Sequence, residues 1–268
     1  MRVRCFTQDD AHLYLTPEQI KQEIIGIYQL TDQVYKTFGF PYKVELSTRP
    51  ENSIGSDEMW ELSTNSLREA LDELGVPYQL NEGDGAFYGP KIDFHLRDSL
   101  GRTWQCGTIQ LDMNLPERFD MEYVGPDGQR HRPVMLHRVV YGSMERIMGI
   151  LPEHFAGAFP LWLAPVQAKV LTITERADDA ALALVRKLEA AGLRVEADLR
   201  NEKIGFKVRE AQMMKIPYML VIGDQEAENG TVSLRTRTGK TINGLSQDEV
   251  MQGMLAEQDS KALDAHWA

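Results

Sequence analysis

Polar side chains gather at three places where the apolar pattern predicts strands buried on at least one face. They stand near the start of the chain, along a predicted hairpin, and on the strand and helix that end the first half: Gln8, Asp9, Asp10 and His12; Tyr88, Lys91, Gln105, Thr108 and Gln110; His137 and Arg146. Buried polar groups need hydrogen-bonding partners, so such clusters are either internally satisfied networks or ligand sites. For any one of these residues taken alone, a structural role is the commoner outcome.

The predicted hairpin carries the most suggestive spacing. Along a regular strand Gln105 and Thr108 point to opposite faces, whereas Thr108 and Gln110 share one face. A β-bulge at Gly107 would bring Gln105 and Thr108 together, and bulges often occur beside active sites. A bulge at Gly107 is thus the arrangement that would place Gln105 and Thr108 beside one polar pocket.

Two histidines, His12 and His137, are candidate metal ligands. Histidines so far apart in a sequence are more often unrelated, and a catalytic zinc site takes three protein ligands. Cys5 is a poor third ligand, because it lies an odd number of residues before His12 and would point to the opposite face of one continuous strand. The residues alone leave the metal site open.

The first 160 residues predict an antiparallel sheet with helices. Thr16 and Pro17 open a helix over residues 17–38, and its apolar stripe is Ile20, Ile24, Ile27, Leu30, Val34 and Phe38. Alternating residues 92–97 predict one arm of a long antiparallel hairpin over residues 87–113. A strand over residues 134–140 runs into a helix over residues 143–151.

The rest of the chain follows a regular pattern after a joint between Pro160 and Pro165. Strands at residues 169–174, 194–199 and 218–222 alternate with helices at 178–191 and 205–214. A hairpin that turns at Thr238 and Gly239 precedes a last helix from about Ser246. This alternation predicts a small α/β domain with a mixed sheet, so we expect two domains, residues 1–160 and 161–268.

The composition excludes fibrous and membrane-spanning proteins. Hydrophobic residues make up 43% and charged residues 26% of the 268, and the net charge is −11. No apolar run approaches the ~18 residues of a membrane span, and the first ten residues lack the apolar core of a signal peptide. Two cysteines favour reduced thiols, so we expect a cytoplasmic protein with no membrane partner. The best basic patch for a polyanion is residues 200–209, with four cations and one anion.

Short motifs in matching order and spacing carry a family resemblance over essentially the whole chain. They are residues 1–12 (MRVRCFTQDDAH), 46–51 (LSTRPE), 55–60 (GSDEMW), 85–92 (GAFYGPKI), 105–108 (QCGT), 142–146 (GSMER) and 198–205 (DLRNEKIG). The first resembles the second half of motif two of the class II aminoacyl-tRNA synthetases, in the form found in the threonyl-tRNA synthetase family. Residues 142–146 resemble motif three, and residues 198–205 resemble the anticodon-binding domain of the same family.

The resemblance implies a fold and a role for each matching position. The fold is a partial α+β class II catalytic core with an antiparallel sheet, followed by a small α/β anticodon-binding domain. The threonine pocket would be lined by Gln8, Asp10, Tyr88, Lys91 and Gln110. His12 and His137 would be two of three zinc ligands, and zinc would take the amino group and the hydroxyl of threonine, which valine cannot offer.

The resemblance also implies an ATP site and an anticodon site. Arg2 would hold phosphate, Phe6 and Arg146 would enclose adenine, and Gln105 and Thr108 would contact the nucleotide, with Arg2, Gln105 and Arg146 as the catalytic residues. The anticodon would be read by Asn201, Lys203, Arg209, Glu226 and Arg235, because single-stranded loops present unstacked base edges to such side chains.

The chain departs from the family pattern at its start. The third zinc ligand (a cysteine), motif one with its dimer contact, the first half of motif two with its arginine, and the editing domain would all lie upstream of Met1. Cys5 stands where the family has a glycine. We therefore expect a weak zinc site and an incomplete form of a homodimeric enzyme.

The function implied is that of a threonine–tRNA ligase, which uses ATP with Mg²⁺ to activate L-threonine and transfers it to threonine-specific tRNA. Two alternatives stay open. One is a non-catalytic paralogue that binds RNA through residues 165–268, and the other is a fragment that results from an incomplete gene model.

Overall fold

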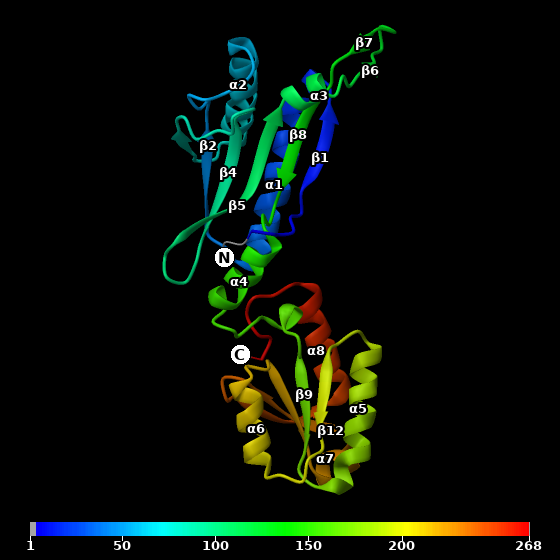
Figure 1. Cartoon of the computed structure of the whole chain (residues 1–268). Helices are drawn as coiled ribbons and strands as arrows, with labels where there is room; N and C mark the ends of the chain where they lie inside the picture. Colours follow the sequence, from blue (N-terminus) through cyan, green and yellow to red (C-terminus); the bar gives the residue numbers. More distant parts are fainter. Residues whose placement is uncertain (1–3, 268) are drawn as a thin grey trace. The chain divides into compact units, whose positions relative to one another are not determined.

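The computed structural model describes residues 4–267, so Arg2 lies outside the described residues. The chain divides into two compact units, Met1–Glu153 and His154–Ala268, and each has its own sheet and hydrophobic core (Figure 1). Among the described residues, no helix combines the length and the apolar content needed to cross a lipid bilayer.

The first unit is a six-stranded sheet covered by helices. Its elements are β1 (Ala11–Leu15), η1 (Pro17–Gln19), α1 (Ile20–Phe38), β2 (Tyr42–Ser47), α2 (Asp57–Leu74), β3 (Gln79–Asn81), β4 (Lys91–Arg97), β5 (Thr103–Asp112), α3 (Asn114–Arg118), β6 (Tyr123–Val124), β7 (Arg130–His131), β8 (Val134–Val139) and α4 (Met144–His154). The strand order is β1-β8-β5-β4-β2-β3, and every neighbouring pair is antiparallel except β2 with β3.

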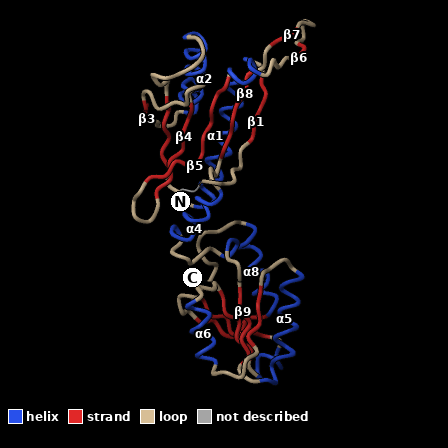
Figure 2. The backbone as a smooth tube through the Cα atoms, in the orientation of Figure 1, coloured by secondary structure: helices blue, strands red, loops and turns tan. Residues whose placement is uncertain are grey.

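The two faces of this sheet have opposite character. Strand side chains such as Ile92, Phe94 and Ile109 are fully buried and join the core formed with α1 and α2, which lie along one face (Figure 2). Because successive strand residues alternate, the residues between them, such as Asp93 and Thr108, face the other side. The polar residues of the predicted site therefore share the face that these helices leave open.

The buried face of α1 departs from the predicted stripe. The buried residues are Ile20, Ile24, Ile27, Tyr28, Thr31 and Tyr35. Leu30, which the periodicity placed on the buried face, is 42% exposed, so that part of the prediction is wrong. After Ile27, the predicted residues and the buried residues both follow helical spacing. The second set is buried because its tyrosines pack large rings into the core and their hydroxyls find hydrogen-bonding partners.

The second unit is a five-stranded mixed sheet between helices. Its elements are η2 (Leu161–Leu163), β9 (Ala168–Thr172), η3 (Glu175–Ala177), α5 (Asp178–Ala190), β10 (Val195–Asp198), α6 (Ile204–Met213), β11 (Tyr218–Ile222), α7 (Asp224–Asn229), β12 (Thr231–Thr236), β13 (Thr241–Ser246) and α8 (Gln247–Asp259). In the order β10-β9-β11-β12-β13, the first three strands are parallel and the last two pairs are antiparallel. Helices α5 and α8 pack on one face, and α6 packs on the other.

Candidate functional site

Strand register places the predicted site residues in one row across the open face of the first sheet. His12 of β1 lies opposite His137 of β8, and His137 lies opposite Gln110 of β5. Gln110 in turn lies opposite Lys91 of β4. Residues directly opposite each other share a face and contact one another, so four strands that are distant in sequence deliver one continuous polar surface.

The carboxylate of Asp93, which is almost fully buried, organises the next row. It accepts hydrogen bonds from Lys91 Nζ at 2.6 Å, Gln105 Nε2 at 2.6 Å, Thr108 Oγ1 at 3.0 Å and Ser47 Oγ at 3.2 Å. The buried charge is thus compensated by one cation and three neutral donors. Lys91, Gln105 and Thr108 are held in fixed positions as a result.

The bulge predicted in β5 is confirmed. The register between β4 and β5 shifts between Asp93 and His95, so that Asp93 pairs with Thr108 while His95 pairs with Gln105. The extra residue lets Gln105 and Thr108 reach the same carboxylate, and Gln105 Nε2 also lies 3.2 Å from Thr108 Oγ1. Without the bulge the two side chains would point to opposite faces.

A second buried carboxylate, Asp112, orients His137. Its Oδ2 lies 3.1 Å from His137 Nε2, and its Oδ1 accepts the backbone N–H groups of Asn114 and Leu115 at 2.8 and 2.9 Å. Burial acts to raise the pKa of Asp112, but these hydrogen bonds together lower it below its ordinary value. A histidine fixed in this way presents its other ring nitrogen, Nδ1, to a ligand.

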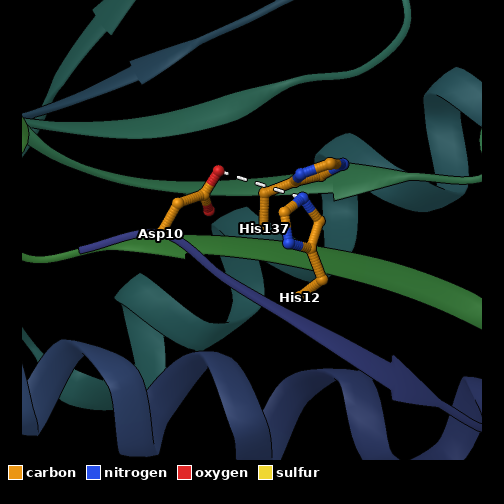
Figure 3. Close-up of side chains that lie close together, drawn as sticks. All are labelled: Asp10, His12 and His137. Atoms are coloured by element: carbon orange, nitrogen blue, oxygen red, sulfur yellow. Dashed lines mark ion pairs between the residues drawn. The ribbon is translucent and has the colours of Figure 1, made fainter. Parts of the chain in front are cut away.

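His12, His137 and Asp10 form a group with the composition of a metal site. One ligand atom from each lies within 4.8 Å of the others, and the two imidazole rings are 4.5 Å apart (Figure 3). Asp10 Oδ2 lies 3.9 Å from His12 Nε2. Two imidazoles and a carboxylate are ligands that zinc takes, so the donor set fits that metal. Asp10 and His12 are exposed, whereas His137 is partly buried.

Tyr88 lies beside this group, with its ring near that of His137. Its hydroxyl donates to Gln110 Oε1 at 2.8 Å, which fixes the carboxamide in one orientation. Burial first, and then the negative charges of Asp112 and Asp10, raises the pKa of Tyr88. The phenol therefore stays protonated and remains a donor at neutral pH.

The segment before β1 docks on the junction between β8 and α4. The carboxylate of Asp9 accepts the backbone N–H groups of Val140, Tyr141 and Gly142 at distances between 2.9 and 3.2 Å. This contact places Phe6, Gln8 and Asp10 along the same open face.

These residues line an open pocket of about 590 Å³. Of the residues proposed for threonine and ATP, the pocket includes Phe6, Gln8, Asp10, Tyr88, Lys91, Gln105, Thr108, Gln110, His137 and Arg146, and His12 adjoins it through His137. The Arg146 side chain donates to the backbone oxygen of Gln105, and its guanidinium lies 5.7 Å from the centre of the Trp104 ring. Phe6 is 51% exposed, so its ring is available to a planar ligand.

The five residues proposed for the anticodon are placed on several elements of the second unit. Asn201 and Lys203 are exposed in the loop after β10, and Glu226 lies on α7 after β11. Because β10 and β11 run in the same direction, these three lie towards one edge of the sheet. Arg209 lines a separate hollow along α6, and Arg235 lies on β12 opposite Met219.

The basic patch at residues 200–209 offers fewer available cations than the sequence suggested. Arg200 is bound by the carboxylates of Asp198 and Glu210, and Lys207 is 2% exposed. Lys203 and Arg209 remain exposed. The carboxylate of Glu226 is also engaged, since it accepts Ser233 Oγ at 2.9 Å and the Gly223 N–H at 3.1 Å.

Three acidic residues organise the first unit, and only the first of them belongs to the polar clusters that the sequence indicated: Asp9, Asp93 and Asp112. Asp9 and Asp112 bind backbone amides, which a sequence does not reveal. In the sequence Asp93 is only a polar position within the alternating residues 92–97. Its place two residues after Lys91, on the same face, is the feature that could have indicated it.

Comparison with known proteins gives a family to each part of the chain. Residues 1–155 match the family described as the tRNA synthetase class II core domain (G, H, P, S and T). Residues 163–257 match the family described as the anticodon binding domain. The predicted fold class, a partial class II core followed by an anticodon-binding domain with a mixed sheet, is confirmed.

Proteins similar to this chain include threonine–tRNA ligases and a threonyl-tRNA synthetase structure. The threonine–tRNA ligase of Caldanaerobacter subterraneus subsp. tengcongensis is 62% identical over 263 residues, which are 98% of this chain and 41% of that protein. The threonine–tRNA ligase of Acetivibrio thermocellus is 67% identical over 237 residues, 88% of this chain and 37% of that protein. The RNA binding domain of threonyl-tRNA synthetase from Cryptosporidium parvum Iowa II is a solved structure with a TM-score of 0.90 and 41% identity, covering 98% of this chain and 66% of that one. The chain spans about two fifths of the length of the curated relatives.

Proposed function

We propose that this chain, which belongs to the class II tRNA synthetase family, carries the threonine-activating pocket and the anticodon-binding domain of a threonine–tRNA ligase. In the proposed reaction the carboxylate of L-threonine attacks the α-phosphate of ATP, which forms threonyl-adenylate and releases pyrophosphate. The ribose at the end of threonine-specific tRNA then takes the threonyl group and releases AMP. The observation that carries the proposal is that four residues form a single row across the sheet and that Asp93 bonds to the last of them: His12, His137, Gln110 and Lys91.

The His12 end of the row suits the side chain of threonine. Zinc bound by His12 and His137 would supply a Lewis acid for the amino group and the hydroxyl of threonine. The carboxylate of Asp10 would accept a hydrogen bond from either group. Gln110, fixed by Tyr88, would limit the size of the side chain that enters. A site built to bind a hydroxyl rejects an analogue without it, because its own polar groups are then left unpaired.

The part of the pocket beside Asp93 and α4 suits ATP, whereas Lys91 belongs to the proposed threonine pocket. Phe6 and Arg146 would enclose adenine, by stacking and by attraction between the guanidinium and the ring. Gln105 and Thr108, held on Asp93, would contact the nucleotide, and the ammonium of Lys91 would offset negative charge on the substrates. Mg²⁺ would accompany ATP, and Arg2 is proposed for phosphate on the resemblance of its motif.

The second unit would bind the anticodon of the tRNA. Asn201 and Lys203 have exposed side chains that suit unstacked bases and the RNA backbone. Arg209, Glu226 and Arg235 remain part of the proposal, although Glu226 would have to share its carboxylate with Ser233.

Threonine selectivity tests the proposal. Calorimetric titration of the full chain with zinc in excess would use sulfamoyl analogues of threonyl-adenylate and valyl-adenylate, which differ only in the group that reaches His12. We expect the threonyl analogue to bind ~10²-fold or more tightly than the valyl analogue, and Asp10→Ala to reduce that preference. Equal affinity for the two analogues, or no binding of either, would refute the proposal.

RNA binding without catalysis is the second candidate, and the separate core of the second unit favours it. Titration of the full chain with the anticodon stem-loop of threonine-specific tRNA distinguishes the two. Binding of the stem-loop together with failure to bind either adenylate analogue would support the second candidate.

A further inference from the structure

Tyr35 is a fully buried tyrosine on α1, and its hydroxyl contacts the sheet from the face that the helices cover. The hydroxyl donates to the carbonyl oxygen of Val140 at 2.7 Å and accepts the backbone N–H of Gly107 at 3.0 Å. Burial above all raises the pKa of Tyr35, so the phenol stays protonated and keeps its donor role. The proposed chemistry makes no use of this group.

Both partners of the hydroxyl lie at irregular points of the backbone. Gly107 belongs to the bulge of β5, and Val140 begins the turn that Asp9 holds from the other side. One hydroxyl therefore ties the bulge to the junction between β8 and α4. Arg146, which bonds to the backbone oxygen of Gln105, joins the same two elements on the pocket side.

Gly107 is small enough to admit the hydroxyl. A Cβ at this position would lie 2.7 Å from the Tyr35 oxygen, 3.1 Å from the carbonyl oxygen of Val140 and 3.1 Å from the ring of Phe94. No side chain fits without moving one of these groups. The tyrosine and the glycine are therefore complementary parts of one contact.

We propose that Tyr35 is a positioning residue for the nucleotide half of the pocket: its hydroxyl holds the bulge that presents Gln105 and Thr108 together on Asp93. The identity of the ligand rests on the proposed function, whereas the contact between Tyr35 and the bulge does not. If the hydroxyl is removed, the Gly107 N–H and the Val140 oxygen lose their buried partner. The bulge then gains freedom to return towards regular pairing, which would turn Gln105 away from Asp93.

The ring of Tyr35 has a separate role. It packs edge-on against Phe94, Phe40 and Tyr42 at centroid distances of 5.3 to 6.4 Å. Phenylalanine would keep this packing, so Tyr35→Phe removes the hydroxyl and little else. Tyr28→Phe is the matched control, because Tyr28 lies on the buried face of the same helix and its hydroxyl contacts Tyr42 at 3.1 Å.

The test compares the two variants in the full chain. Amide hydrogen exchange at Gly107, followed by NMR, reports on the bulge, and titration with the threonyl-adenylate analogue reports on the pocket. We expect Tyr35→Phe to accelerate amide exchange at Gly107 about tenfold or more and to lower the affinity for the analogue about tenfold. Loss of a buried hydrogen bond changes an equilibrium constant by roughly that factor. Tyr28→Phe should leave both unchanged.

A double substitution adds a readout that loss of stability alone would not give. Gly107→Ala should lower the affinity for the analogue strongly in the wild-type background. The loss should be smaller in the Tyr35→Phe background, where the closest clashing atom, the tyrosine hydroxyl oxygen, is absent. Equal behaviour of Tyr35→Phe and Tyr28→Phe in both measurements would overturn the inference. If wild type binds no analogue, the proposed function fails, and exchange at Gly107 alone then supports or overturns the role of Tyr35.

Discussion

Replacing Asp93 with asparagine tests whether this carboxylate holds the site together. The substitution keeps the shape of the side chain but removes the charge and one acceptor oxygen. Each carboxylate oxygen accepts two hydrogen bonds, Oδ1 from Gln105 and Thr108 and Oδ2 from Lys91 and Ser47. Whichever oxygen becomes the amide, two donors lose their acceptor.

The expected cost follows from the burial of the ion pair. The side chain of Asp93 is 2% exposed and that of Lys91 is 14% exposed, and their charged atoms are 2.6 Å apart. Breaking a buried pair by removing one partner costs about 3–5 kcal/mol. Lys91 retains some access to water and to Asp84 at 3.9 Å, so we expect a cost below that range, about 2–3 kcal/mol.

The assay must measure the free energy of unfolding of each unit separately. Hydrogen exchange measured peptide by peptide in increasing urea gives a free energy of unfolding for each unit within the full chain. Asp93→Asn should lower this energy for the first unit and leave that of the second unchanged. Glu122→Gln is the matched control, because it makes the same chemical change at the exposed pair with Arg130 and should cost under about 1 kcal/mol.

Equal effects of Asp93→Asn and Glu122→Gln on the first unit would contradict the proposed role of this carboxylate. The four contacts would then add nothing beyond an exposed pair, and the order of Gln105 and Thr108 would need another cause.

Three further predictions concern other charged groups. Lys207→Met should destabilise the second unit by about 1–3 kcal/mol, because the buried ammonium satisfies two backbone carbonyls; an unchanged or raised unfolding energy would contradict this. Burial acts to raise the pKa of Asp98, but hydrogen bonds in its turn lower it to about 2, so its contribution to stability is present above the ordinary value of 3.8 and is lost as the pH falls towards 2. The difference in unfolding energy between wild type and Asp98→Asn should therefore shrink over that range, and a constant difference would argue against the shift. Metal analysis after dialysis with zinc should find well under one equivalent, since Asp10 and His12 are exposed to water, and His137→Ala should bind less; a full equivalent on wild type would contradict this expectation, and a full equivalent on His137→Ala would show that other ligands hold the metal.

Much of the fold was predictable because its evidence is local. Alternation in residues 92–97 and the strand–helix pattern after Pro165 each reflect one buried face, and the structure has β4 and the mixed sheet where these patterns placed them. The bulge at Gly107 could be anticipated because Gln105 and Thr108 share a face only if the strand is irregular between them.

The remaining features depend on pairings that no local pattern contains. His12 meets His137 only because β1 pairs with β8, and residues alone gave no reason to pair these strands. The cations Arg200 and Lys207 looked available in the sequence, but Asp198 binds the first, and the packing of α6 on the sheet buries the second.

A crystal structure of this chain with the threonyl-adenylate analogue tests the central claim most directly. We expect the threonyl group between Asp10 and the two imidazoles of His12 and His137, and the adenine between Phe6 and Arg146. An analogue bound elsewhere on the chain, or bound here with its threonyl group turned away from the histidines, would contradict it.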